Sequence, residues 1–181
     1  YIQSLEAMHV DGLIITTNYS NNPNYEKLEV PIVALDRVLQ GAIPTVTSNG
    51  HDGGKKAAQF LLDHGATELV VISGPSKLPT IRKRRDGFEE IAGKHLVASI
   101  ESPFHFQGAL GAANYLFDHY DCNGIFAAND VIAAATIQVA AERGIAIPEQ
   151  LQIIGYDGIE LGQMISPPLT TIAQPIYQMG E

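Results

Sequence analysis

The sequence predicts an α/β protein built around parallel sheets, and two observations carry this expectation. Short apolar runs bounded by turn residues alternate along the chain with longer segments of helical apolar spacing, which is typical of strands joined by helical crossovers. The runs have the length and apolar character of strands buried on both faces. With 181 residues, 45% of them hydrophobic, the chain can form one large domain or two small lobes.

Five strands are expected in chain order, each at one of the apolar runs. They lie at Gly12-Leu-Ile-Ile-Thr16, Pro31-Ile-Val-Ala-Leu35, Leu69-Val-Val-Ile72, Gly124-Ile-Phe-Ala127 and Leu151-Gln-Ile-Ile154. Four helices are expected at residues 53–64, 80–94, 108–119 and 131–143. Gly65 and Gly144 follow two of these helices and are predicted to end them, because glycine readily adopts the left-handed conformation at helix ends. The polar stretch 18–24 is expected to be a loop.

Composition narrows the class of protein further. The net charge of -9 and the pI near 5.0 oppose contact with nucleic acid, which requires a basic face. The single Cys122 cannot form an internal disulfide, and no apolar run is long enough to span a bilayer. We therefore expect a cytoplasmic protein that makes no membrane contact. The chain opens without a methionine in what reads as the end of a helix, so the true N-terminus is expected to be missing.

Two of the predicted strands end in polar residues. Asn129 follows the run 124–127, and Asp157 follows the run 151–154. In an open parallel sheet ligands bind outside the carboxyl ends of the strands, so both side chains are expected at one binding site. Asp130 directly follows Asn129 and starts a predicted helix, so its simplest role is a helix cap.

An ordered set of motifs resembles the effector-binding core of lactose/galactose-repressor-type transcriptional regulators, most closely the ribose-operon repressors. The resemblance covers almost the whole chain. The motifs are Pro31-Ile-Val-Ala-Leu-Asp36-Arg37, Ser48-Asn49 before Gly53-Gly54, Ile72-Ser-Gly-Pro75, Arg84-Arg-Asp-Gly87-Phe88, Ala128-Asn129-Asp130, Ile154-Gly-Tyr-Asp157 and Pro167-Pro-Leu-Thr-Thr-Ile-Ala-Gln174-Pro175.

This resemblance implies a two-lobed fold of the periplasmic-binding-protein (type I) kind, with ligand bound in the cleft between the lobes. Residues 1–49 and 174–181 would then belong to the N-terminal lobe, and residues 50–173 would form the C-terminal lobe. The family's N-terminal helix-turn-helix and the first strands of its first lobe do not occur in the sequence, so we expect an N-terminally truncated core.

The resemblance also implies the residues of a sugar site. Asp36 and Arg37 follow a predicted strand, where a carboxylate and a guanidinium can grip adjacent hydroxyls; a strand-end ion pair is the plainer alternative. Arg84 stands one helical turn before Phe88 and would point to the ligand. Its neighbours in the basic run are expected on a solvated face; they are Arg82, Lys83 and Arg85.

The remaining implied contacts lie later in the chain. Phe106 takes the family's aromatic position, where a ring packs on the C–H face of a sugar, although core packing is the more common role of phenylalanine. Phe104 is expected in the core, and His105 has no partner that suggests catalysis. Asn129, Asp157 and Gln174 complete the set, which resembles a ribose site. Ribose, a neutral sugar, is therefore the expected ligand.

No motif supports catalysis, a metal or a cofactor. The glycines in Asn49-Gly-His-Asp-Gly-Gly54 form neither a dinucleotide fingerprint nor a phosphate loop, and backbone clearance at a helix start explains them. The six histidines never recur at i, i+4, and one cysteine gives no zinc spacing. Ser48 and Ser73 lack the pattern of a nucleophile elbow. The sequence therefore predicts a protein that is not an enzyme.

Three functions remain open at this point. The favoured one is the sugar-sensing core of a bacterial transcriptional regulator, which binds operator DNA only through the absent N-terminal domain and acts as a homodimer. The alternative is an exported, periplasmic-type sugar-binding protein of similar fold. The third is an α/β enzyme acting on sugars, which no motif supports.

Overall fold

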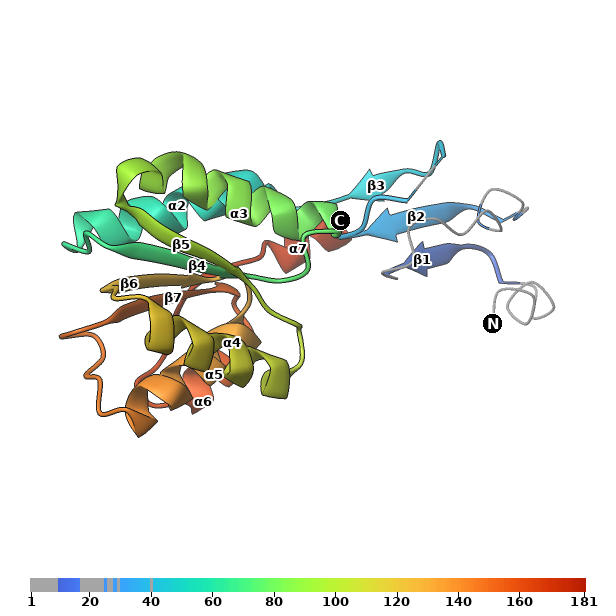
Figure 1. The fold of residues 1–181 in the computed structure, drawn as a ribbon. Coiled ribbons are helices and arrows are strands. Elements are labelled where there is room, and N and C mark those ends of the chain that lie inside the picture. The colour runs from blue at the N-terminus through green and yellow to red at the C-terminus, as the bar shows by residue number, and fades with distance from the viewer. Residues whose placement is uncertain (1–9, 17–24, 26–27, 29, 40) are drawn as a thin grey trace. The chain divides into compact units, whose positions relative to one another are not determined.

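The computed structural model describes residues 10–16, 25, 28, 30–39 and 41–181 (Figure 1). The chain divides into two compact units. Unit 1 comprises Tyr1–Ser48 and Pro175–Glu181, and unit 2 comprises Asn49–Gln174. Each unit has its own parallel sheet, which confirms the predicted α/β class.

Unit 2 is built on a five-stranded sheet in the order β5-β4-β6-β7-β8. The strands are β4 (Leu69–Ser73), β5 (Leu96–Glu101), β6 (Gly124–Ala127), β7 (Gln152–Asp157) and β8 (Thr170–Ala173). Every ladder in this sheet is parallel. Strands β4 and β6 are buried along their whole length, as the continuous apolar runs predicted.

Two helices cover each face of this sheet (Figure 1). Helices α2 (Gly50–Asp63) and α3 (Pro79–Ala92) lie on one face, and α4 (Phe106–His119) and α5 (Asp130–Glu142) lie on the other. Successive residues of β4 point to opposite faces: Leu69 and Val71 pack under α2 and α3, whereas Val70 and Ile72 pack under α4 and α5. The period of two along a strand thus divides the core into two layers.

The predicted helices are confirmed, but all four begin one to three residues earlier than expected. Helix α2 begins at Gly50 because the Asn49 side chain accepts a hydrogen bond from the Asp52 N–H at 3.2 Å and so caps the first turn. Helix α4 begins at Phe106, where His105 supplies the cap by accepting from the Gly108 N–H. Gly65 and Gly144 follow α2 and α5 with φ of 89° and 71°, which confirms both as helix ends.

Unit 1 contains a three-stranded sheet in the order β1-β2-β3. Its strands are β1 (Leu13–Ile15), β2 (Ile32–Leu35) and β3 (Thr45–Val46), and α7 (Ile176–Gly180) belongs to the same unit. A small cluster of Tyr25, Ala34 and Leu39 forms its core. The loop expected at 18–24 and the helix end expected before residue 9 lie outside the described residues.

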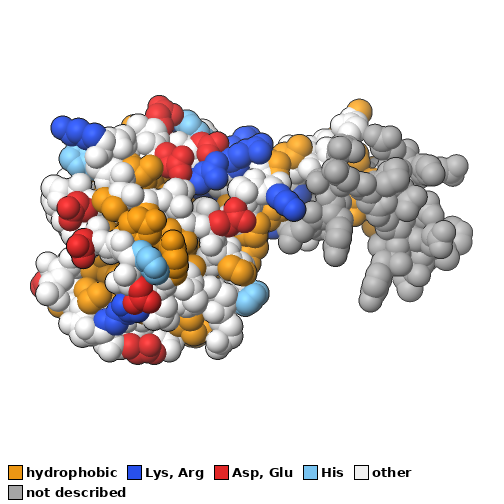
Figure 2. All heavy atoms as spheres, viewed as in Figure 1, with side chains coloured by type: hydrophobic (Ala, Val, Ile, Leu, Met, Phe, Trp, Pro, Cys, Tyr) orange, Lys and Arg blue, Asp and Glu red, His pale blue; other side chains and the backbone are white. Residues whose placement is uncertain are grey.

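Charged side chains of both signs are mixed over the α2–α3 layer (Figure 2). Arg82 and Lys83 are exposed, as predicted, whereas Arg85 is half-buried and pairs with Asp86 and Glu89. Such a surface presents no continuous basic face to phosphates. Within the described residues, no helix combines the length and apolar character needed to cross a membrane.

Candidate functional site

The ends of strands β7 and β8 bring two of the predicted contacts together. Asp157 is the last residue of β7 and pairs in register with Ala173 of β8, so Gln174 lies directly beside it. The Gln174 Nε2 donates a hydrogen bond to Asp157 Oδ1 at 2.8 Å, and the two backbones are joined by Gln174 N–H to Asp157 C=O at 3.1 Å. Asp157 adopts φ of 110°, a conformation that non-glycine residues rarely adopt.

Arg84 joins this pair from helix α3. Its side chain is only 4% exposed, and Nη1 lies 2.9 Å from Asp157 Oδ1. The same nitrogen donates to the Ala128 C=O at 2.8 Å, just beyond the end of β6. The guanidinium stacks over the Tyr156 ring at 3.8 Å from its centroid, a favourable cation–π geometry. One arginine therefore contacts the ends of both β6 and β7.

Close packing of α2 on α3 places Arg84 at this position. A Cβ atom at Gly54 would lie 2.0 Å from the Arg84 carbonyl oxygen, and a Cβ atom at Gly87 would lie 2.0 Å from the His51 carbonyl oxygen. Only glycine allows such an approach of two backbones. The backbone clearance inferred from the sequence thus serves the close packing of α2 on α3.

Burial raises the pKa of the Asp157 carboxyl above its ordinary value of 3.8. The Arg84 charge and the Gln174 hydrogen bond oppose this effect, and the negative charge of Asp130 adds to it. Desolvation of the charged form exceeds the attraction to arginine. Additional hydrogen-bond donors would therefore stabilise the charged form of the Asp157 carboxyl.

The unliganded protein should lose part of its stability as the pH rises through the raised pKa of Asp157. The fold favours the protonated carboxyl, so this contribution is complete below the ordinary pKa and is lost above the raised one. Urea unfolding of the wild type and of Asp157→Asn, across about pH 3 to 7, measures the difference. Identical pH profiles for the two proteins would contradict the raised pKa.

The structure contradicts the cap role predicted for Asp130 and leaves the ligand role of Asn129 a prediction. Asn129, not Asp130, caps α5: its backbone is extended and its Oδ1 accepts from the Ile132 N–H at 2.7 Å. The expectation that Asp130 is the cap is wrong because Asp130 already lies inside the first helical turn, and its buried carboxylate turns to the sheet side instead. Asn129 is 9% exposed; with its oxygen engaged in the cap, its amide nitrogen is the group left for a ligand.

Among the described residues, no ring pair or ion pair joins Phe106 to this cluster. It is the first residue of α4 and is 37% exposed. Phe104 is half-buried and lies against Gly74, where a Cβ atom would come within 2.3 Å of the ring. Phe104 thus packs against the turn after β4 but belongs to neither core cluster of unit 2, so its expected core role is not confirmed, and the ligand role of Phe106 stays a prediction.

Asp36 and Arg37 form an ion pair at the end of β2 in unit 1. Arg37 Nη1 lies 2.9 Å from Asp36 Oδ2 and also donates to the Asp36 carbonyl oxygen at 2.5 Å. Asp36 has φ of 52°, and its Oδ1 is buried without a hydrogen-bond partner among the described residues. The strand-end ion pair weighed from the sequence is present, and a buried carboxylate oxygen retains capacity to accept.

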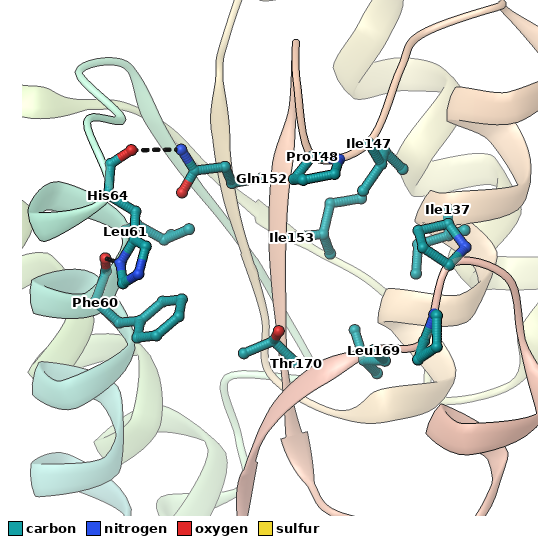
Figure 3. A pocket seen from close by; sticks show the side chains of 12 residues that line it. Phe60, Leu61, His64, Ile137, Ile147, Pro148, Gln152, Ile153, Leu169 and Thr170 are labelled. Atoms are coloured by element: carbon teal, nitrogen blue, oxygen red, sulfur yellow. Dashed lines mark hydrogen bonds between the residues drawn. The ribbon is translucent and has the colours of Figure 1, made fainter.

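A hollow of about 400 Å³ lies elsewhere in unit 2, between the end of α2 and the residues that lead into β8 (Figure 3). Its walls are mostly hydrocarbon, from residues such as Phe60, Ile147 and Leu169. Gln152 Nε2 donates across one side to the His64 C=O at 2.8 Å (Figure 3). None of the seven predicted contacts lines this hollow, although the first four residues of the motif that begins at Pro167 do. It lacks the converging donors and acceptors that a sugar requires.

The described residues contain no group of three or more His, Cys, Asp or Glu side chains arranged to hold a metal ion. The chemistry of the site is instead that of a guanidinium, a carboxylate and two amides at the carboxyl ends of parallel strands. These groups can exchange hydrogen bonds with a polyol. The parallel α/β fold, with polar side chains gathered at its strand ends, is of the kind found in periplasmic-binding-protein-like domains.

Residues 58–181 match the family model of the periplasmic binding protein-like domain, and the chain belongs to this family. It is 40% identical to the ribose operon repressor of Halalkalibacterium halodurans over an alignment of 183 positions, which covers 99% of this chain and 55% of that protein. The ribose operon repressor of Bacillus subtilis is also 40% identical, over 100% of this chain and 56% of its own length. The chain thus spans about half the length of these relatives.

Solved structures agree with the sequence comparisons. A LacI family transcriptional regulator from Enterococcus faecium with bound ribose superposes with a TM-score of 0.86 at 31% identity, covering 99% of this chain and 71% of that one. These matches confirm the resemblance to effector-binding cores of the lactose/galactose-repressor type.

Proposed function

We propose that this chain is the sugar-sensing, effector-binding core of a bacterial transcriptional regulator. The observation that carries the proposal is the cluster of Arg84, Asp157 and Gln174, joined by hydrogen bonds at the strand ends. Its groups complement a neutral polyol. The matched relatives are named as operon repressors, which favours a regulator over an exported carrier and over an enzyme.

The proposed ligand is ribose or a similar monosaccharide. Arg84 would donate to hydroxyl oxygens, Asp157 would accept hydroxyl protons, and the amides of Asn129 and Gln174 would complete the set. Asp36, Arg37 and Phe106 stay proposed contacts on the family resemblance. Binding of operator DNA is proposed for a segment outside this chain, since the charge of -9 opposes contact with phosphates. A homodimer in the cytoplasm is the proposed working form.

Calorimetry of the full-length protein with a panel of monosaccharides, followed by product analysis, tests this function. We expect ribose to bind and to be recovered unchanged. Mobility-shift assays with operator DNA, with and without ribose, then measure whether the sugar alters DNA affinity. Turnover of the sugar, or DNA affinity that no sugar changes, would contradict the proposal.

Ribose should bind more tightly than ribose 5-phosphate, by roughly tenfold or more, which corresponds to about 1.4 kcal/mol. In unit 2 the charges of Arg84 and Asp157 cancel at 2.9 Å, so the site has no surplus cation for a phosphate. A phosphate dianion would face the Asp157 carboxylate in partly desolvated surroundings, which is costly. Titration of both compounds under one buffer condition measures the ratio, and tighter binding of the phosphate ester would reveal a cation that this cluster lacks.

A further inference from the structure

A buried carboxylate beside the sugar cluster connects the segments that carry the predicted contacts. Asp130 is 0% exposed at the start of α5. Its Oδ2 accepts hydrogen bonds from the backbone N–H groups of Gly158 and Ile159, each at 2.8 Å. Its Oδ1 accepts from Thr171 Oγ1 at 2.6 Å. Three donors thus satisfy a charge that would otherwise be very costly to bury.

Each segment that Asp130 holds carries a proposed ligand contact. Asn129 precedes Asp130 on the chain, and Asp157 precedes Gly158. Thr171 lies on β8, three residues before Gln174. One carboxylate therefore connects the start of α5, the turn after β7 and strand β8, which approach the site from three parts of the sequence.

Gly155 and Gly158, on either side of Tyr156 and Asp157, let the chain pass close to the Asp130 carboxylate. A Cβ atom at Gly155 would lie 2.4 Å from Asp130 Oδ1, so the missing side chain lets β7 pass close to it. Gly158 has φ of 76°, which turns the chain so that two successive N–H groups reach one oxygen. The alternative role of Asp130 is a favourable negative charge at the N-terminus of α5. That role would explain neither Gly155 and Gly158 nor the hydrogen bond from Thr171 of β8.

We propose that Asp130 is a positioning residue of the sugar site, which fixes Asp157 and Gln174 relative to Asn129. It touches no ligand itself and acts through the segments it holds. The inference rests on the proposed function, because it assigns Asp130 a role in sugar affinity. Its consequence is that sugar affinity depends on a side chain buried behind the contacts.

Calorimetry with ribose on the full-length protein tests the proposal through Asp130→Asn, Thr171→Val and a matched control, Asp118→Asn. Asp118 is an exposed α4 residue paired with Arg143, so its change should leave ribose affinity unaltered. Asp130→Asn, which presents an amide to backbone donors, should weaken ribose by roughly tenfold or more, since small misplacements of binding groups are costly. Thr171→Val keeps the Asp130 charge and should give a smaller loss.

Two NMR measurements on the unliganded protein accompany the calorimetry. In Asp130→Asn, the amide protons of Gly158 and Ile159 should exchange faster. The pKa of Asp157 should fall, because the groups that face it are Arg84, Gln174 and Asp130, and one negative charge is removed. A loss of packing elsewhere would change neither quantity selectively.

The outcomes separate the two proposals. A folded Asp130→Asn protein with wild-type ribose affinity would overturn the positioning role. Unchanged exchange of the Gly158 and Ile159 amide protons in that protein would overturn it as well. If Asp130→Asn does not fold, wild-type affinity in Thr171→Val would overturn it. If the wild type binds no sugar, the proposed function fails, and the amide exchange and Asp157 pKa alone decide whether Asp130 fixes these segments.

Discussion

Replacing Arg84 with alanine should lower ribose affinity by about 1.5 to 3 kcal/mol, the range for hydrogen bonds to charged groups. The change would remove a proposed donor to the sugar. It would also break the link between the ends of β6 and β7, which Nη1 joins through the Ala128 C=O and Asp157 Oδ1. It also leaves the Asp157 carboxylate without its counter-charge. The free energy of unfolding should fall as well, because the Asp157 carboxylate would remain partly buried without a counter-charge.

Two further variants make the Arg84 result interpretable. Arg82→Ala changes an exposed arginine on the same helix and should leave ribose affinity unchanged. Arg84→Lys keeps the charge but loses the planar guanidinium over Tyr156 and should bind with intermediate affinity. Isothermal titration calorimetry compares the ribose affinities of these variants, after urea unfolding has shown that each one is folded. Wild-type affinity in Arg84→Ala would remove Arg84 from the site.

Replacing Gly54 with alanine should destabilise unit 2 by about 1 to 3 kcal/mol or more, as overpacking does. The new methyl group would lie 2.0 Å from the Arg84 carbonyl oxygen and 2.8 Å from the Phe88 nitrogen. Both are backbone atoms, so no side chain can swing aside and α3 must move from α2. Because Arg84 sits at this contact, ribose affinity should fall together with stability.

Gly111→Ala is the matched control for Gly54→Ala. Gly111 lies within α4, and a Cβ atom there meets nothing within 4 Å. The same chemical change should therefore raise stability, by roughly 0.5 to 1 kcal/mol from the better helix propensity of alanine. Denaturant unfolding of both variants measures the two free energies. A Gly54→Ala protein as stable as Gly111→Ala would show that the helices separate without cost.

The central strands could be predicted from the sequence because their burial is uniform. β4 and β6 are buried at every residue, and such strands are continuous apolar runs. β5 and β8 were missed, since partly exposed strands contain polar and small residues: β5 reads Leu-Val-Ala-Ser-Ile-Glu and alternates in burial, and β8 begins with two threonines. β3 has only two residues, too few for any pattern.

Part of the proposed set of contacts could be predicted to lie together, but the network that holds them could not. Arg84, Asp157 and Gln174 come together as the resemblance implied, whereas the structure does not connect Phe106 to them. The role of Asp130 depends on partners 28 to 41 residues away along the chain. A local sequence pattern cannot predict hydrogen bonds over such a separation. Gly155 and Gly158, on either side of the Tyr156-Asp157 pair, were the available signal, since paired glycines beside a polar strand end indicate a close approach of other groups.

The backbone of Asp157 bears on how this protein has been selected. A side chain held at φ of 110° costs the fold on the order of 1 to 3 kcal/mol, and glycine would relieve that strain. Burial of the carboxylate adds a second cost at neutral pH. Glycine at this position would, however, leave the largely buried Arg84 without its counter-charge, and the cost of such an unpaired buried charge exceeds the strain relieved. In laboratory evolution for thermal stability, Asp157 is therefore expected to persist even where no effector response is demanded, because it neutralises Arg84.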